Sequence, residues 1–186
     1  RIAAGVVQGI AFALDIPVIP VSTLKAIAQR AYDVTGLSNV MVAIDARMDE
    51  VYWSAYHLDD AGWSSIEEEC VISPDRLDVK TTMSQKEGDW VAAGTGWSSY
   101  QQRLLADDVD APKKILDDFY PSAEVIAKLA AEEYRAGNTV AAAEAIPVYL
   151  RNDVAQDTGY RYGYRSLFCC TLYRLRSDFE IRTGAP

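Results

Sequence analysis

The apolar positions of this chain follow a helical spacing in three long segments. Residues 2–14 are nearly all small or apolar, which predicts a helix with most of its circumference buried. Apolar residues at helical spacing after Ser22 and Thr23 predict a second helix, capped by one of these hydroxyls and ended by Gly36. A third helix is predicted over residues 123–136.

Between these helices the pattern changes to short runs that favour strands. Residues 40–46 and 51–58 predict two strands of a hairpin whose charged tip is 47–50. Further strands are predicted over 16–21, 65–72, 90–93 and 148–150. The rest of the middle region predicts a loop with one helical turn over 74–89, a helix over 97–105 and a polar connector over 107–118. Such an alternation of strands and helices is typical of an α/β fold.

Length and composition indicate a globular protein. The chain has 186 residues, of which 49% are hydrophobic, so it can build a core and is not a disordered acidic protein. The net charge of −9 opposes a role as the main nucleic-acid-binding surface, because phosphate contacts need a basic patch. An acidic adaptor whose basic partner holds the RNA is compatible with that charge.

The few cysteines and the single histidine limit which disulfides, metal sites and catalytic groups the chain can form. Three cysteines, two of them adjacent at Cys169 and Cys170, give no disulfide framework, so a reducing cytoplasm is expected. The single histidine, His57, excludes a metal site that needs two histidines from this chain. It is interpreted as an ordinary strand histidine, and no Gly-x-Ser-x-Gly motif accompanies it.

The two ends of the sequence depart from the middle. The chain starts at Arg1 inside an apolar run that is shorter than the ~20 residues needed to span a bilayer. We interpret it as truncated at its N-terminus, neither secreted nor bound to a membrane. Residues 156–186 carry a net charge of +2, which leaves −11 on residues 1–155. Arginine interleaved with tyrosine suits an RNA-binding arm, and a frameshifted or foreign segment is the favoured alternative.

Two groups of residues are candidates for binding or chemistry. Gly94-Thr95-Gly96 lies between a predicted strand and helix, as a phosphate-binding loop does, although a tight structural turn is the better interpretation of a lone Gly-x-Gly. A group of charged residues shares the hairpin tip, namely Asp45, Arg47, Asp49 and Glu50. For these, a solvated turn and a contact site for a partner are both favoured over catalysis, because no histidine or second acidic motif is near in sequence. The acidic run 67–69 predicts a solvated face.

Five segments, in this order along the chain, resemble the TsaB (YeaZ) family. They are residues 1–11, 16–24, 42–53, 94–97 and 147–152, and the hairpin residues that carry the resemblance are Asp45, Arg47, Glu50, Tyr52 and Trp53. The resemblance implies an α/β, actin-like (ASKHA) fold with an incomplete first lobe. On this basis residues 1–36 are a remnant of the first lobe, 37–155 form the second lobe, and 156–186 do not match the family.

The resemblance also implies a function. Members of the family are non-catalytic partners of TsaD, the subunit that attaches the threonylcarbamoyl group to N6 of adenosine in tRNA, and they help to recruit the ATPase TsaE. TsaD carries a metal-binding His-x-x-x-His, which a chain with one histidine cannot supply. The implied subunit interface is the first helix, through Ile2, Gly5, Val6, Gly9 and Phe12. No cofactor of its own is expected, while ATP or ADP at an interface in the complex, a homodimer and only indirect contact with tRNA stay open.

Two other classes of function remain as alternatives. Older descriptions of this superfamily as glycoproteases suggest a peptidase, which requires a nucleophile or a metal. A stand-alone nucleotide- or RNA-binding protein would use Gly94-Thr95-Gly96 and the arginine- and tyrosine-rich tail. Helix 2–14 keeps two interpretations as well, because Gly5 and Gly9, four residues apart, suit tight packing within a core as well as contact with a partner.

Overall fold

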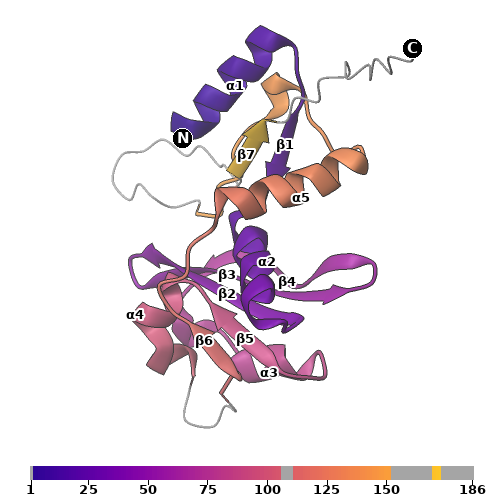
Figure 1. The fold of residues 1–186 in the computed structure, drawn as a ribbon. Helices are drawn as coiled ribbons and strands as arrows, with labels where there is room; N and C mark the ends of the chain where they lie inside the picture. Colours follow the sequence, from indigo (N-terminus) through magenta and orange to yellow (C-terminus); the bar gives the residue numbers. More distant parts are fainter. Residues whose placement is uncertain (1, 106–110, 152–168, 173–186) are drawn as a thin grey trace, which may run out of the picture.

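The computed structural model describes residues 2–105 and 111–151 and the strand at 169–172 (Figure 1). Its largest element is a mixed five-stranded sheet of order β4-β3-β2-β5-β6. The strands of this sheet are β2 (Asn39–Arg47), β3 (Glu50–Asp59), β4 (Gly62–Ile72), β5 (Trp90–Ala93) and β6 (Lys114–Leu116). β2, β3 and β4 form an antiparallel meander, while β5 pairs in parallel with β2 and β6 pairs in parallel with β5.

Helices cover both faces of the sheet, which explains why its central strands are apolar on both sides. One face packs against α2 (Thr23–Thr35) through Val40, Val42 and Val91. The other face packs against α3 (Val79–Ser84) and α4 (Thr95–Leu104). Three fully buried tryptophans fill this second core, namely Trp53, Trp90 and Trp97. Although the predicted domain boundary lies at residue 36, α2 packs directly on the sheet that follows it in sequence.

A smaller group of elements lies beyond the end of α2 (Figure 1). It consists of α1 (Ile2–Leu14), β1 (Val18–Val21), α5 (Ala123–Arg135), the 3-10 turn η2 (Ala142–Glu144) and β7 (Cys169–Leu172). β1 pairs antiparallel with β7, and Val18 also forms a bridge with Val140. The core of this group lies between α2, α5 and β1, with Leu129 and Ile19 at its centre.

The sequence signals that begin and end helices act as expected. The Ser22 hydroxyl accepts hydrogen bonds from the backbone N–H groups of Leu24 and Lys25, at 3.1 and 3.2 Å, and so caps α2. Gly36 ends the helix in the left-handed conformation with φ 71°. These contacts confirm the predicted limits of this helix, with Ser22 rather than Thr23 as its cap.

Several details of the predicted elements were wrong. No strand forms at 148–150, the strand predicted from residue 16 starts at Val18, and the helix predicted from 97 starts at Thr95. The connector 107–118 contains β6, a three-residue strand too short to show a period of its own. Helix α1 forms as predicted, but only Ala11 is buried, because a single face of the helix packs on the rest of the chain.

The prediction that 67–69 form a solvated acidic face was also wrong for two of the three residues. The Glu67 carboxylate accepts hydrogen bonds from Trp53 Nε1 (2.6 Å) and the Thr82 hydroxyl, whereas Glu69 accepts from the Tyr56 hydroxyl (2.7 Å) and from Ser22. Register shifts in the β3–β4 pairing place these two glutamates against opposite faces of the sheet. Burial and the Glu69 carboxylate raise the pKa of the Tyr56 phenol far above its usual value.

Within the residues that the structure describes, no helix has both the length and the apolar character needed to cross a membrane.

The turn between β5 and α4 generates a stability prediction. A Cβ atom at Gly94 would lie 2.3 Å from the Ala43 carbonyl oxygen, and Gly94 has a φ of +113°. We therefore expect Gly94→Ala to lower the free energy of unfolding by roughly 2–4 kcal/mol, measured by urea unfolding followed by circular dichroism.

Gly5→Ala is the control, because a Cβ atom at Gly5 would have no neighbour within 4 Å and alanine favours a helix. It should unfold at the same or a higher urea concentration than the wild-type chain. If Gly94→Ala behaved like this control, the close approach of α4 to β2 would be refuted.

Candidate functional site

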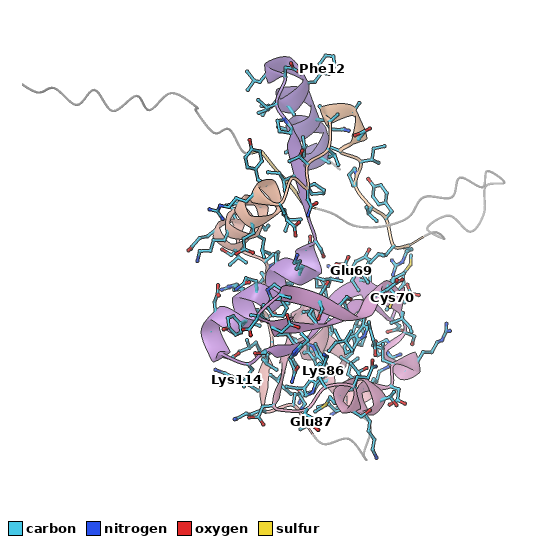
Figure 2. The ribbon with its side chains drawn as sticks, turned by 90° about the vertical axis from the view of Figure 1, so that its right-hand side faces the viewer. Phe12, Glu69, Cys70, Lys86, Glu87 and Lys114 are labelled. Atoms are coloured by element: carbon cyan, nitrogen blue, oxygen red, sulfur yellow. The ribbon has the colours of Figure 1, made fainter. Side chains whose placement is uncertain are left out.

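The first candidate surface is the outward face of α1, which we call the α1 face and define as Ile2, Gly5, Val6, Gly9 and Phe12. The exposed fractions of Ile2, Val6 and Phe12 are 87%, 55% and 80%. Phe12 lies at the end of the helix that is farthest from the sheet (Figure 2). No polar side chain interrupts this face, since the only polar residue of the helix, Gln8, donates to the Ala142 carbonyl oxygen on the packed side (3.2 Å).

The glycines of the α1 face leave it open to close contact. No atom lies within 4 Å of the position of a Cβ at either Gly5 or Gly9, so neither glycine is required by packing inside the described chain. Beside Gly9 and Phe12 the surface has an apolar hollow of about 280 Å³, completed by Ala142 and Ala143 of η2. The face therefore offers apolar area and a shallow recess, which are the properties of a protein–protein contact surface.

The second candidate surface is the hairpin tip, which we define as residues 47–50 between β2 and β3. Three consecutive residues that are not glycine, Arg47, Met48 and Asp49, have φ values of 64°, 55° and 55°. Left-handed backbone at such residues costs of order 1 kcal/mol or more each, and a tight hairpin of this kind ordinarily uses Asn-Gly. The tip is therefore held in this conformation by its surroundings.

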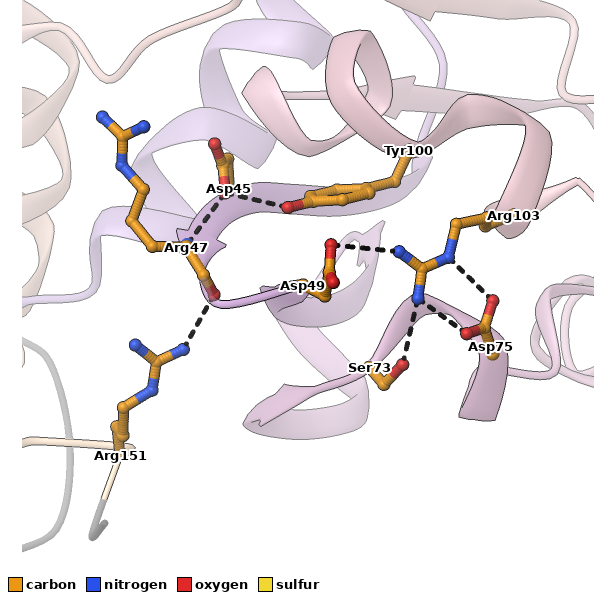
Figure 3. A network of polar contacts seen from close by, with 8 residues as sticks. All are labelled: Asp45, Arg47, Asp49, Ser73, Asp75, Tyr100, Arg103 and Arg151. Carbon is orange, nitrogen blue, oxygen red and sulfur yellow. Dashed lines mark hydrogen bonds and ion pairs between the residues drawn. The ribbon is translucent and has the colours of Figure 1, made fainter. Parts of the chain in front are cut away.

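Two arginines from distant parts of the chain hold the tip (Figure 3). Arg151 donates to the Arg47 carbonyl oxygen (3.1 Å) and to the Glu50 carboxylate (2.5 Å). Arg103 of α4 makes a two-pronged ion pair with Asp75, at 2.8 and 2.6 Å, and reaches Asp49 at 3.4 Å. These bonds join the tip to α4, to the segment after β4 and to the segment that ends at Arg151.

Asp45 stabilises the base of the tip from within β2. Its carboxylate accepts the backbone N–H of Arg47 at 2.8 Å and the Tyr100 hydroxyl at 3.5 Å. Its own backbone N–H donates to the Thr95 hydroxyl at 3.1 Å. Partial burial, together with the Asp45 and Asp49 carboxylates, raises the pKa of Tyr100. Asp45 therefore stabilises the local structure of the hairpin.

The structure separates the remaining hairpin residues from the tip. Trp53 is fully buried in the core against α4, and Tyr52 packs half-buried against the opposite core beneath α2. They lie on opposite faces because neighbouring residues of a strand alternate. Within the hairpin, Asp45, Arg47, Asp49 and Glu50 meet at the tip, while these two aromatic residues support the strands behind it.

Gly94 joins β5 to α4 as the N-cap of the helix, and Thr95 and Gly96 form the start of its first turn. Cβ atoms at Gly94 and Gly96 would lie 2.3 and 2.9 Å from atoms of Ala43, so both glycines permit the helix to approach β2. Farther along α4, a hollow of about 390 Å³ is lined by Ser98, Ser99, Tyr100, Gln101, Gln102 and Arg103. The packing against Ala43 accounts for both glycines without a nucleotide.

His57 and the possible metal-ligating side chains were the candidates for catalytic groups among the described residues. His57 Nδ1 makes a 2.7 Å hydrogen bond with Asn39 Oδ1, and the Ser64 hydroxyl donates to the His57 carbonyl oxygen (3.2 Å) rather than to the imidazole ring. No group of three or more His, Cys, Asp or Glu side chains in the described part of the chain is arranged to hold a metal ion. The arginine- and tyrosine-rich tail lies outside the described residues except for the backbone of β7.

Sequence reasoning did not identify the two arginines that hold the tip. Arg151 was included only as part of the segment 147–152 that resembles the family, and Arg103 and Tyr100 were not singled out. The one available signal was the acidic tip itself, because clustered carboxylates in a folded protein need cations nearby. Which cations these are depends on how α4 and the C-terminal segment pack, and the sequence does not show this.

Comparison with known proteins gives consistent matches. Residues 1–158 match the family model described as TsaD: tRNA N6-adenosine threonylcarbamoyltransferase. The chain is 40% identical over 156 residues to tRNA threonylcarbamoyladenosine biosynthesis protein TsaB of Escherichia coli (strain K12), with 83% of this chain covered. It is 38% identical over 167 residues to the protein of the same name from Haemophilus influenzae, again with 83% covered. The chain spans 66% and 65% of the length of these two relatives.

Solved structures agree with the sequence matches. YeaZ from Pseudomonas aeruginosa superposes with a TM-score of 0.71 at 43% identity, covering 81% of this chain and 67% of that one. A second structure from the same organism, described as an uncharacterized protein with similarity to peptidase YEAZ, gives 0.72 at 44% identity with the same coverage. Together with the family model, these neighbours confirm the predicted α/β, actin-like fold.

The ion pair beside the tip generates a prediction about protonation. Hydrogen bonds from Arg103 hold the pKa of Asp75 below its usual range. The lowered pKa means that the pair stabilises the fold above the unfolded pKa of Asp75, and that this stabilisation is lost as the pH falls through the folded pKa. Arg103→Leu should raise the Asp75 pKa toward its usual range, measured by carboxyl carbon NMR.

Asp78 provides an internal control for that titration. Its pKa is also lowered, but by the hydroxyl and backbone N–H of Thr81 rather than by Arg103. It should therefore titrate identically in the wild-type chain and in Arg103→Leu. An unchanged Asp75 pKa in the variant would contradict the ion pair described here.

Proposed function

The chain belongs to the TsaB (YeaZ) family, and from this membership we propose that it is a non-catalytic adaptor subunit in the synthesis of tRNA N6-threonylcarbamoyladenosine. In this proposal it acts in the cytoplasm, pairs with a TsaD-type subunit that carries out the transfer, and helps to recruit a TsaE-type ATPase. The observation that carries the proposal is the α1 face, an uninterrupted apolar surface on a helix that already packs on its other side.

Physical chemistry favours a partner on that face. Burial of exposed side chains such as Ile2, Val6 and Phe12 is worth about 25 cal/mol for each Å² removed from water. Gly5 and Gly9 have no packing neighbour in the described chain, yet glycine in the middle of a helix costs roughly 0.5–1 kcal/mol relative to alanine. Two such glycines on the exposed face are explained if a second backbone approaches them closely.

The non-catalytic part of the proposal rests on the side chains present. The resemblance assigns the metal-binding His-x-x-x-His to the catalytic subunit, and these 186 residues contain one histidine. The Asp49 and Glu50 carboxylates of the hairpin tip are held by Arg103 and Arg151, which suits a structural or contact role. An alternative peptidase role would need an activated nucleophile beside the His57 imidazole, whose recorded hydrogen bond is to Asn39.

A substitution in the α1 face tests the proposal. We expect Gly9→Leu to keep or raise the thermal stability of the isolated chain, because the site is open and leucine favours a helix over glycine by about 0.8 kcal/mol. The same change should weaken binding to the TsaD-type subunit of the same organism at least tenfold, because the leucine side chain would hold the two backbones apart. Size-exclusion chromatography with light scattering, followed by titration calorimetry, measures both effects.

Ala127→Leu is the matched control, since Ala127 is an exposed residue in the middle of α5. It should leave the complex unchanged. Full-length Escherichia coli TsaB with its own TsaD serves as the positive control for the assay. A Gly9→Leu chain that binds as tightly as the wild type would remove the α1 face from the interface, and a wild-type chain that forms no complex would refute the adaptor role.

A further inference from the structure

The hairpin tip presents two exposed side chains, Arg47 and Met48. The Met48 sulfur accepts one long contact from Arg151 Nη1, at 3.7 Å. In the described chain, Arg47 has no recorded side-chain hydrogen bond or ion pair, although carboxylates of Asp45, Asp49 and Glu50 lie close by in sequence. Figure 3 shows its guanidinium group directed away from the other residues of the network. Next to it, the Met48 side chain is 71% exposed. An unpaired cation and an exposed apolar side chain therefore stand together at the turn.

The protein holds these two residues in place rather than leaving them mobile. Arg151 and Arg103 fix the tip from opposite sides, through the Arg47 carbonyl oxygen, Glu50 and Asp49. The backbone is thereby kept in a left-handed conformation that Arg47 and Met48 would not favour by themselves. Strained backbone that is firmly held is characteristic of functional contacts, because the ordering is completed before a partner arrives.

The α1 face by itself is small for a stable complex. A 13-residue helix is about 20 Å long and about 10 Å wide, so one face offers on the order of 200–400 Å². Stable interfaces commonly bury about 800 Å² on each partner. A stable complex through α1 therefore needs contacts beyond the α1 face.

Building on the proposed function, we propose that the hairpin tip is a second contact with the same TsaD-type subunit. In this contact, Arg47 pairs with a carboxylate of the partner and Met48 enters an adjoining apolar depression. The charge of the tip favours a protein over RNA, because the exposed carboxylates of Asp49 and Asp75 would repel a phosphate backbone. A carboxylate next to an apolar surface meets the requirements of both side chains.

A short segment of backbone links the two contact regions. Ala145 is buried with Ala11 of α1 and Val18 of β1, and Arg151, six residues later, binds the hairpin tip. The segment between them thus runs from the packed side of α1 to the tip. It fixes the position of the tip relative to the group of elements that presents the α1 face, as a two-part interface requires.

Charge reversal at the tip tests the proposal. The affinity of the chain for the TsaD-type subunit of the same organism is measured by titration calorimetry at low and at high salt. We expect Arg47→Glu to weaken binding about tenfold or more at low salt and less at high salt, because salt screens an exposed ion pair. Met48→Ala should weaken binding by a smaller factor that does not depend on salt.

Arg135→Glu is the charge-matched control, at an exposed arginine in the last turn of α5 for which no ion pair is recorded. It should change the affinity less than twofold, and all variants should have the circular dichroism spectrum and melting temperature of the wild type.

If Arg47→Glu binds like Arg135→Glu while the wild type binds, the second contact is refuted and the adaptor role stands. If Arg47→Glu weakens the binding of tRNA to the complex but leaves the affinity for the TsaD-type subunit unchanged, the tip contacts RNA and the proposal is again refuted. Failure of the wild-type chain to bind the subunit refutes both proposals.

Discussion

The close approach of α4 to β2 is the contact on which the rest of the sheet region depends. Gly94 and Gly96 place the first turn of α4 directly against Ala43, with no side chain between them. That position buries Trp97 beside Trp53 in the core and directs Tyr100 and Arg103 toward the end of the hairpin. The conformation of the hairpin tip is therefore a consequence of how near a helix can come to a strand. Gly94 and Gly96 resemble part of a phosphate-binding loop, but here their lack of a side chain allows a helix to pack closely on a strand.

The two candidate surfaces differ in how well their side chains are satisfied by the rest of the described chain. Around the hairpin tip, nearly every charged side chain is paired, and acidic residues of β4 that lie against the core accept hydrogen bonds from Trp53, Tyr56 and neighbouring hydroxyls. Along the α1 face, large apolar side chains are left exposed to water and the helix contributes no charge at all. Unpaired polar groups are costly when buried, and exposed apolar area is costly in water. The cost of unpaired polar groups is largely avoided within the described chain, whereas the apolar area of the α1 face stays uncovered by the described residues.

These features support the proposal of a subunit that binds a partner and does not itself catalyse the transfer. The fold is actin-like, and in the part of the chain described by the structure the charged residues at the end of the hairpin are engaged in holding a turn. Arg151, Arg103 and Asp45 all serve the shape of the hairpin tip. The exposed side chains of the tip, the unpaired Arg47 and the apolar Met48, are suited to contact with another protein surface.

The sequence by itself determined the kind and order of most elements, because these depend on local signals. Helical spacing, the Ser22 cap, the Gly36 end and the charged turn between two β-rich runs all act within a few residues. Through its resemblance to a family it also indicated the fold class and the proposed partner. It did not reveal β6, which is only a three-residue strand held by its neighbour β5, or the absence of a strand at 148–150.

Only the tertiary structure decided which side chains meet. Glu67 and Glu69, two residues apart in one strand, would share a face in a regular sheet, yet register shifts against β3 send them to different cores. Helix α1 was predicted to be mostly buried because its residues are apolar, yet only Ala11 is buried. The apolar residues of a helix do not determine how much of the remaining protein packs against it. The partners of the hairpin tip, Arg103 and Arg151, come from segments about 50 and 100 residues away. Contacts at such separations follow from the packing of whole elements, and no local pattern of residues encodes them.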